Sequence, residues 1–469
     1  MRLRTFLVLL AFASAACRVG PNYQRPAIAP PAAFRAPQPL PPDQAASIAD
    51  LKWFEVFKDP QLQDLIRTAL TRNYDLRDAV ARVEAADANL GIVRSDQYPH
   101  VGAGGSVEFN RLSRDGATPL PAAFLPNQNR TFGTAVLQLL SFEIDIWGRL
   151  RRATEAARAN LLSAEETRKA VVTTLVSDVA TAYLTLRELD YELEISQRTL
   201  QTREESLDLV RQRQTGGVAT RLDLRQAEEL VYTAAETIPA TQEQIEQHEN
   251  QISLLLGENP GSVVRGRGLT DQDLPPAVPP GLPSALLQRR PDIRAAEQDL
   301  VAANAEIGVA RAAYFPQISL SGFLGGESTQ LSSLFSGPHS AWSVVPQVTQ
   351  PIFTAGRIKS GVRLAQAERD HALVQYEKAI QTAFTEVSDA LIAHQRMRES
   401  REKQEALVNA LEDRLRLAYM RYRGGVDTQL NALDADRDLF TAQLSLAQLR
   451  LEEILSVVQL YKALGGGWQ

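Results

Sequence analysis

The chain has little that could hold a metal ion or a covalent crosslink. Among its 469 residues there are one cysteine, five histidines and three methionines. A single cysteine cannot form an internal disulfide, and scattered histidines do not supply the ligand set of a structural zinc site. We therefore expect neither a metal site nor a cofactor.

Concentrated positive charge and long apolar runs are also missing. The formal net charge is −6, whereas a nucleic-acid-binding domain carries a concentrated basic face. After residue 17, no window approaches the roughly 20 apolar residues that a membrane-spanning helix requires. If the mature chain crosses a bilayer, we expect it to do so with strands.

Motifs of catalysis are absent as well. The sequence has no phosphate-cradling Gly-Lys-Ser/Thr loop, no paired metal-binding histidines and no nucleophile elbow. We therefore expect no enzymatic activity.

Residues 1–16 have the pattern of a secretory signal peptide. Arg2 and Arg4 precede an apolar run from Phe6 to Ala13, and three small residues lead into Cys17. The cysteine has two interpretations. It is either the acylated residue of a bacterial lipobox or a cysteine that follows an ordinary signal by chance. Arg18 comes next rather than Asp, which favours the outer membrane.

The rest of the chain consists of two sequence repeats. Gly216-Gly217-Val218 recurs as Gly424-Gly425-Val426, an offset of 208 residues. Two other landmarks share that offset: Gly148-Arg149 with Gly356-Arg357, and Leu256-Gly257 with Leu464-Gly465. Such a repeat indicates one structural unit used twice.

Each copy contains a long helical hairpin. Apolar residues recur in 4-3 steps from Leu175 to Val210, which is the pattern of a coiled-coil seam. The stretch from Gly148 to Gly216 would form a helix of roughly 100 Å at 1.5 Å per residue. Glycine suits the turn after it, because a positive φ lets two helices reverse tightly.

The inserts follow a period of two. Within 99–148 and 315–356, apolar residues alternate with small or polar ones over about ten residues at a time. Each insert is predicted to be a β-hairpin, suited either to a membrane barrel or to a soluble subdomain packed on the helices. Four strands cannot close a barrel, so a barrel requires strands from other copies of the chain.

Several motifs together resemble one family, the TolC-like outer membrane efflux factors, and within it the NodT-type lipoprotein branch. The resemblance covers nearly all of the mature chain. It is carried by the twin Gly-Gly-Val turns and by three further segments: Cys17-Arg18-Val19-Gly20-Pro21-Asn22-Tyr23 with Pro26, Arg290-Pro291-Asp292-Ile293-Arg294, and Ala463-Leu464-Gly465-Gly466-Gly467-Trp468.

The resemblance implies a mainly α protein with a small β part. The repeated helical hairpins would form an α-barrel, and two β-hairpins per chain would contribute to a 12-stranded β-barrel in a homotrimer. It implies a location in the outer membrane of a Gram-negative bacterium, extending into the periplasm, with a periplasmic adaptor protein and an inner-membrane pump of the resistance–nodulation–division class as partners.

These expectations divide the chain as follows. Residues 1–16 are a signal peptide, 17–60 a lipidated extended segment, 61–98, 149–257, 291–314 and 357–464 the helical tunnel, 99–148 and 315–356 the outer-membrane hairpins, and 258–290 a Pro/Gly-rich equatorial linker. The lipid is expected on Cys17.

An acidic stripe follows the second glycine turn. Asp427, Asn431, Asp434 and Asp438 step by 4, 3 and 4, which places them on one helix face. We expect Asp427 and Asp434 of three chains to form gating rings at the periplasmic tip. The alternative is that Asp427 only caps the helix.

A latch is expected beside the same turn. Tyr422, Arg421 and Arg423 precede it, and Asp223 follows the first turn. Bonds among these side chains would hold the tip shut, with Gly216, Gly217, Gly424 and Gly425 forming the turns.

The predicted function is the outer-membrane exit duct of a tripartite efflux system, which conducts solutes passively. Two alternatives remain at this point. One is a type I protein-secretion outlet on the same fold, and the other is a soluble periplasmic coiled-coil scaffold.

Overall fold

The computed structural model describes residues 18–36, 47–111, 128–272 and 279–468. These residues divide into two compact units, each built from segments distant in sequence. Unit 1 comprises Met1–Pro26, Val83–Ser163 and Ala296–Tyr376. Unit 2 comprises Ala27–Arg82, Ala164–Ala295 and Glu377–Gln469. Any Cys17 lipid lies outside the described residues.

Helices dominate the described chain. The α-helices are α2 (Trp53–Val56), α3 (Pro60–Arg72), α4 (Tyr74–Ser95), α5 (Arg149–Thr215), α6 (Arg221–Leu256), α7 (Pro283–Arg289), α8 (Pro291–Ala312), α9 (Arg357–Arg423) and α10 (Gln429–Ala463). Short 3-10 turns occur at η1 (Ile48–Asp50), η3 (Leu269–Asp271), η4 (Leu331–Ser333) and η5 (Gly337–His339).

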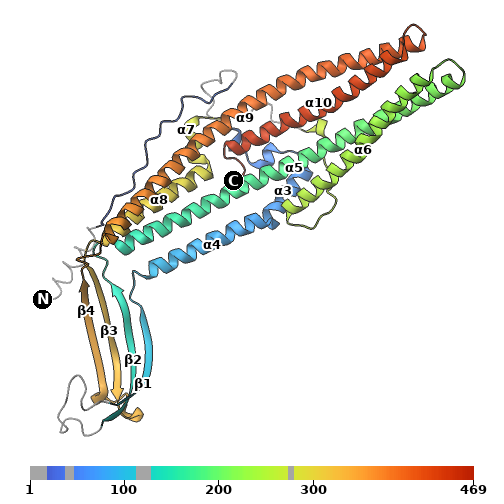
Figure 1. Cartoon of the computed structure of the whole chain (residues 1–469). Helices are drawn as coiled ribbons and strands as arrows, with labels where there is room; N and C mark the ends of the chain where they lie inside the picture. The colour runs from blue at the N-terminus through green and yellow to red at the C-terminus, as the bar shows by residue number, and fades with distance from the viewer. Residues whose placement is uncertain (1–17, 37–46, 112–127, 273–278, 469) are drawn as a thin grey trace. The chain divides into compact units, whose positions relative to one another are not determined.

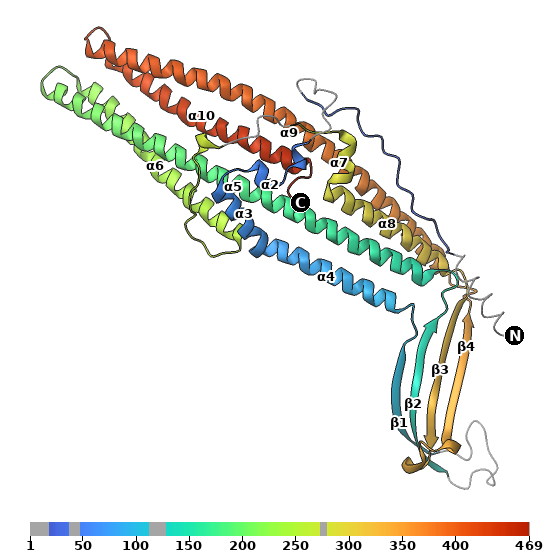
Figure 2. The ribbon, with the colours of Figure 1, turned by 180° about the vertical axis from the view of Figure 1, so that it is seen from behind.

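The strands of unit 1 form one antiparallel sheet. Its order is β1 (Val101–Arg111), β2 (Asn129–Glu143), β3 (Gln317–Ser328), β4 (Ser340–Thr349), so the two hairpins lie side by side (Figures 1 and 2). The β2–β3 register shifts between Leu139 and Phe142. Within the described residues, β1 and β4 each pair on one side only.

One face of this sheet carries large apolar side chains that no other described residue covers. The register aligns Leu137, Leu324 and Trp342 across three strands, and their exposed fractions are 55, 62 and 72 %. A single chain thus leaves a row of large apolar side chains in contact with solvent, which a water-soluble subdomain would bury.

Unit 2 contains the helical hairpins. The helix α6 returns along α5, and α10 returns along α9 (Figure 1). Their seams are apolar, as the 4-3 spacing predicts. Leu207 and Val210 of α5 pack with Ala227 and Val231 of α6. A second cluster joins α9 and α10, and a third joins α5 to α10.

The long helices of the two repeats have equal or nearly equal lengths. Both α5 and α9 have 67 residues, and α6 and α10 have 36 and 35. The expected mainly α fold with a small β part, built from repeated helical hairpins and two β-hairpins, is confirmed. Among the described residues, no helix combines the length and apolar character needed to cross a membrane.

Three element boundaries differ from the sequence prediction. The segment expected to be extended up to residue 60 contains η1 and α2, and α3 begins at Pro60 because Asp59 caps it through Gln61 N. The first helical stretch breaks at Asn73 into α3 and α4. The linker expected over 258–290 includes α7.

The break at Asn73 has a counterpart in the second repeat at Arg290, between α7 and α8. Asn73 Nδ2 donates to the carbonyl of Leu255 at 2.9 Å, and Arg290 Nη1 donates to the carbonyl of Ala463 at 2.9 Å. Leu255 and Ala463 are equivalent positions at the ends of α6 and α10. Each break therefore satisfies a carbonyl that the end of a helix leaves open.

Candidate functional site at the glycine turns

The two glycine turns have the same backbone. Val218 N donates to Arg213 O at 2.8 Å and Gly217 N to Gln214 O at 3.1 Å. The second turn repeats both bonds 208 residues later. This is the Schellman motif that ends a helix with a left-handed residue. Gly217 and Gly425 have φ of 73°, whereas Gly216 and Gly424 lie outside the left-handed region.

The helices that follow the turns begin differently. In α6, Thr220 Oγ1 accepts from Asp223 N at 3.1 Å, and Asp223 Oδ2 accepts from Thr220 N at 2.7 Å. This reciprocal pair is a capping box. In α10 the N-cap residue is Thr428, whose side chain makes no capping bond.

Asp427 precedes that N-cap residue. Its carboxylate accepts from Arg421 Nε at 2.9 Å, Thr428 N at 2.8 Å and Asn431 Nδ2 at 2.6 Å. The bond from Arg421 first, and then those from Thr428 and Asn431, hold the pKa of Asp427 below its usual range. The N-cap position is Thr428, and Asp427 lies one residue before it and accepts from its amide, so the gate and the cap both stay predictions.

The remainder of the acidic stripe is also paired. Asp434 lies 3.1 Å from Arg437 Nη2. Asp438 accepts from Arg414 Nη1 of α9 at 2.7 Å. Within one chain, each carboxylate of the stripe therefore has a guanidinium neighbour.

The expected latch residues meet in a different arrangement. Tyr422 Oη donates to Gln429 Oε1 at 3.3 Å, and Gln429 Nε2 donates to the backbone carbonyl of Asp223 at 3.4 Å. The Asp223 carboxylate is occupied by its capping box, so the structure shows no bond from it to Arg421 or Arg423.

Two arginines near the turns form cation–π contacts with tyrosine rings. The Arg213 guanidinium lies 4.7 Å from the ring centre of Tyr422, and that of Arg423 lies 6.0 Å from the ring of Tyr419. Tyr419 also bonds Ser206 of α5 at 3.2 Å. The two helical hairpins of one chain are thus linked by cation–π and hydroxyl contacts near the turns.

Sequence reasoning missed the most buried charge pair. Arg203 of α5 donates to Asp436 of α10 at 2.6 Å and to the carbonyl of Leu230 of α6 at 2.8 Å. Their side chains are 3 and 8 % exposed, and burial raises the pKa of Asp436. The available signal was that Arg203 occupies a seam position where the pattern demands an apolar residue.

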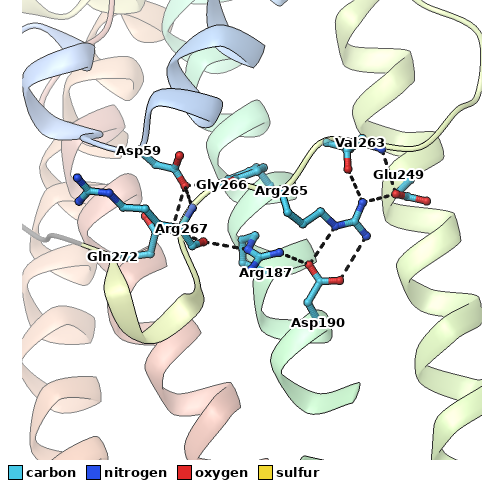
Figure 3. Close-up of polar contacts among 10 residues, drawn as sticks. Asp59, Arg187, Asp190, Glu249, Val263, Arg265, Gly266, Arg267 and Gln272 are labelled. Carbon is cyan, nitrogen blue, oxygen red and sulfur yellow. Dashed lines mark hydrogen bonds and ion pairs between the residues drawn. The ribbon is translucent and has the colours of Figure 1, made fainter. Parts of the chain in front are cut away.

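A second missed cluster fixes the linker after α6. Arg265 pairs with Asp190 at 3.1 Å and with Glu249, and Arg187 Nε donates to Arg267 O at 2.9 Å (Figure 3). The adjoining Arg267 N donates to Asp59 at 2.9 Å. The linker is therefore held by charge-assisted bonds to α5, α6 and the start of α3.

Asp59 also accepts from the hydroxyl of Tyr183 at 2.9 Å, and it is 1 % exposed. Although burial opposes its charge, the hydrogen bonds from Tyr183 and Gln272 leave the pKa of Asp59 below its usual value. Over the described ranges, histidine, cysteine and carboxylate side chains form no group able to hold a metal ion.

Comparisons with known proteins agree with this architecture. A model of the outer membrane efflux protein family matches residues 65–258 and 282–466. The probable efflux pump outer membrane protein TtgC of Pseudomonas putida is 40 % identical over 467 residues, covering 98 % of this chain and 95 % of that protein.

Solved structures give the same result. A membrane protein from Pseudomonas aeruginosa superposes with a TM-score of 0.89 at 37 % identity, covering 96 % of this chain and 98 % of that one. The open state of the MtrE outer membrane channel of Neisseria gonorrhoeae gives 0.87 at 33 %, covering 97 and 99 %.

Proposed function

The chain belongs to the outer membrane efflux protein family, and from this premise we infer that it is an exit channel through which an efflux system passes solutes across the outer membrane. The family match over both repeats carries this conclusion. Conduction is passive, and the chain is not an enzyme. The relatives are named as efflux pump components, which favours efflux over protein secretion.

The channel is proposed to be a homotrimer. One chain supplies four strands whose outer members, β1 and β4, each pair on one side only within the described residues. Because a closed membrane barrel needs about eight strands or more, three copies supplying twelve strands would close it. The row of exposed Leu137, Leu324 and Trp342 would then face lipid.

The partners are proposed to be a periplasmic adaptor protein and an inner-membrane pump of the resistance–nodulation–division class. Cys17 would carry the lipid that anchors the N-terminus. The proposed division is a signal peptide over 1–16, an N-terminal segment over 17–60 that includes η1 and α2, a tunnel of helices, membrane hairpins over 99–148 and 315–356, and an equatorial linker over 258–290 that includes α7.

Asp427 is the proposed gate, with Asp434 one or two turns further along α10. Arg421 lies against Asp427 in each chain, so it would partly neutralise the carboxylates that three chains bring together at the axis. A ring of carboxylates attracts cations and repels itself when crowded. Tyr422, Arg423 and Asp223 would contribute to closure through the contacts with Gln429 and Tyr419.

Single-channel conductance in planar bilayers tests the gate. Asp427→Ala should change conductance and weaken block by divalent cations, because the ring loses its charge. Asp413→Ala is the matched control, since Asp413 also pairs with an arginine near the turn. Unchanged conductance and unchanged block in both Asp427→Ala and Asp434→Ala would refute the gate while leaving the channel intact.

Deletion of the gene tests the function itself. The TtgC relative of another Pseudomonas putida strain is named as a toluene efflux pump component, so we propose small organic compounds as cargo. The deletion strain should become sensitive to some members of a panel of antibiotics, solvents, aromatic acids and metals, and the plasmid-borne gene should restore resistance. A protein released from membranes by carbonate washing would contradict the channel assignment.

A further inference from the structure

Residues 18–26, termed here the N-terminal strap, belong to unit 1 and lie outside its helices and strands. The strap contacts side chains and backbone of α5, α8 and α9. Its amide at Val19 donates to Trp147 O at 3.0 Å, immediately before α5 begins.

A buried arginine is the centre of this contact. Arg152, in the first turn of α5, is 1 % exposed. Its guanidinium donates to the carbonyls of Val19 and Gly20, both at 3.4 Å, and to Asn22 Oδ1 at 2.8 Å. A buried charge is tolerated only when its donors are satisfied, and here the strap supplies three of the acceptors.

The strap also makes a backbone-to-backbone contact. A Cβ atom on Gly20 would lie 2.5 Å from the Cα of Gly308 on α8, and one on Gly308 would lie 2.8 Å from the carbonyl oxygen of Val19. Gly20 has φ of +99°, a conformation that side chains disfavour. Only glycine fits on either side of this contact.

The C-terminal end of the strap is recognised by charge. Arg25 Nη2 pairs with Glu297 of α8 at 2.9 Å, and Arg25 Nε donates to Tyr376 Oη at 3.3 Å. Tyr23 Oη donates to Glu297 Oε1 at 3.2 Å. Burial, and then the Glu297 charge, raise the pKa of Tyr23, so its hydroxyl remains a donor.

The receiving groups all stand on helices. Glu155, one turn along α5, pairs with Arg152 Nη1 at 2.8 Å. Asn304 of α8, which donates to the carbonyl of Pro21 at 3.1 Å, stands on the same helix as Gly308 and Glu297. The wall against which the strap lies is therefore made of residues from helices.

We propose that this wall of α5, α8 and α9 is a peptide-binding site that recognises an extended Gly-Pro-Asn-Tyr-x-Arg segment, filled in this chain by Gly20–Arg25 as a separable intramolecular ligand. Arg152 donates to the main-chain carbonyls of the segment. Gly308 leaves room only for a glycine opposite it. Glu297 binds the tyrosine and the arginine. The site holds Val19–Asn22 against the start of α5, and the inference does not depend on the proposed function.

A full-length chain with its strap displaced tests the site. Gly20→Val cannot seat the strap, but it leaves every receiving residue unchanged. The probe is a synthetic fluorescent peptide of residues 18–26. We expect it to bind the Gly20→Val protein saturably, and at least 10-fold more tightly than it binds wild type, whose site is already filled.

Two controls define specificity. A peptide carrying the same Gly20→Val change, and the wild-type peptide added to a Gly20→Val/Arg152→Gln protein, should each bind at least 10-fold more weakly. Arg158→Gln in place of Arg152→Gln is the matched control, because Arg158 is exposed on the same helix. Equal binding of both peptides, or no binding to the Gly20→Val protein, would overturn the proposal.

A milder variant covers the case in which Gly20→Val does not fold. Full-length Asn22→Ala removes the 2.8 Å bond to Arg152 and should speed hydrogen exchange at the Val19 amide several-fold, with exchange in α10 unchanged. Exchange at Val19 as slow as in wild type would show that Arg152 does not hold the strap.

Discussion

The two glycine turns have the same backbone conformation, but the acidic residue that follows each turn lies at a different position. After the first turn the acid is Asp223, at the third position of α6, and its oxygens serve the capping box. After the second turn Asn431 takes that position, and the acid moves to Asp427, before the helix. The turn geometry is set by glycine, whereas the acid beside the second turn, Asp427, pairs with Arg421 instead of forming a capping box.

The same asymmetry extends along the seams. Arg203 and Asp436 form the buried pair between the repeats, while the positions equivalent by the 208-residue offset are Leu411 and Glu228. Glu228 pairs instead with Arg225 of its own helix. The repeats are therefore alike in backbone and apolar pattern but not in charge.

The largest effect should come from breaking the buried pair. Arg203→Met leaves Asp436 buried without a counter-ion and should lower the free energy of unfolding by about 3–5 kcal/mol. Arg203→Met/Asp436→Leu should recover most of that loss. Chemical denaturation in detergent, followed by circular dichroism, measures both.

The exposed pair between Arg396 and Glu399 supplies the control, since Arg396→Met should cost below about 1 kcal/mol. A cost for Arg203→Met as small as that of the control would mean that the buried pair does not join the repeats.

The turns themselves should respond equally in both repeats. Gly217→Ala and Gly425→Ala force a side chain into a left-handed residue and should each cost about 1–2 kcal/mol. Gly216→Ala should cost much less, because its Cβ would meet atoms no nearer than 3.5 Å. Thermal unfolding of the purified variants measures this, and equal losses at Gly216 and Gly217 would contradict the assigned φ values.

The helix starts should respond unequally. Thr220→Ala removes a capping bond and should cost about 1 kcal/mol. Thr428→Ala, at the equivalent position, removes no capping bond and should be nearly neutral. The same thermal measurement compares them, and a larger loss at Thr428 would reverse the comparison drawn here.

A pH-dependent effect concerns a buried acid of the first repeat. Burial, and then the neighbouring Glu192, raise the pKa of Glu188 to about 8, whereas the equivalent Arg396 is exposed. Because the folded-state pKa is raised, this group's contribution to stability is complete below its ordinary pKa and is lost as pH rises towards 8.

Glu188→Gln keeps the group neutral. It should therefore raise the unfolding temperature by about 2 °C or more at pH 9 and leave it unchanged below pH 4. A pH-independent difference between the two proteins would show that Glu188 does not titrate in this way.

Much of the fold was predictable from the spacing of residues in the sequence. The 208-residue offset, the 4-3 seams and the period-two inserts gave the helices, hairpins and turns within a few residues, because backbone periodicity is a local property. The interruption at Asn73 was not predictable in the same way, since Asn73 stops the helix by bonding Leu255, which lies far along the chain.

The candidate site was likewise predictable only in part. Sequence alone determined the positions of the glycine turns and the acidic stripe, because turn chemistry and helix spacing are written in neighbouring residues. Only the tertiary structure decided that Asp427 pairs with Arg421, that Asp223 is used for capping and that Arg203 meets Asp436. Charged side chains choose partners by proximity and burial, and helices distant in sequence become neighbours only once the chain has folded.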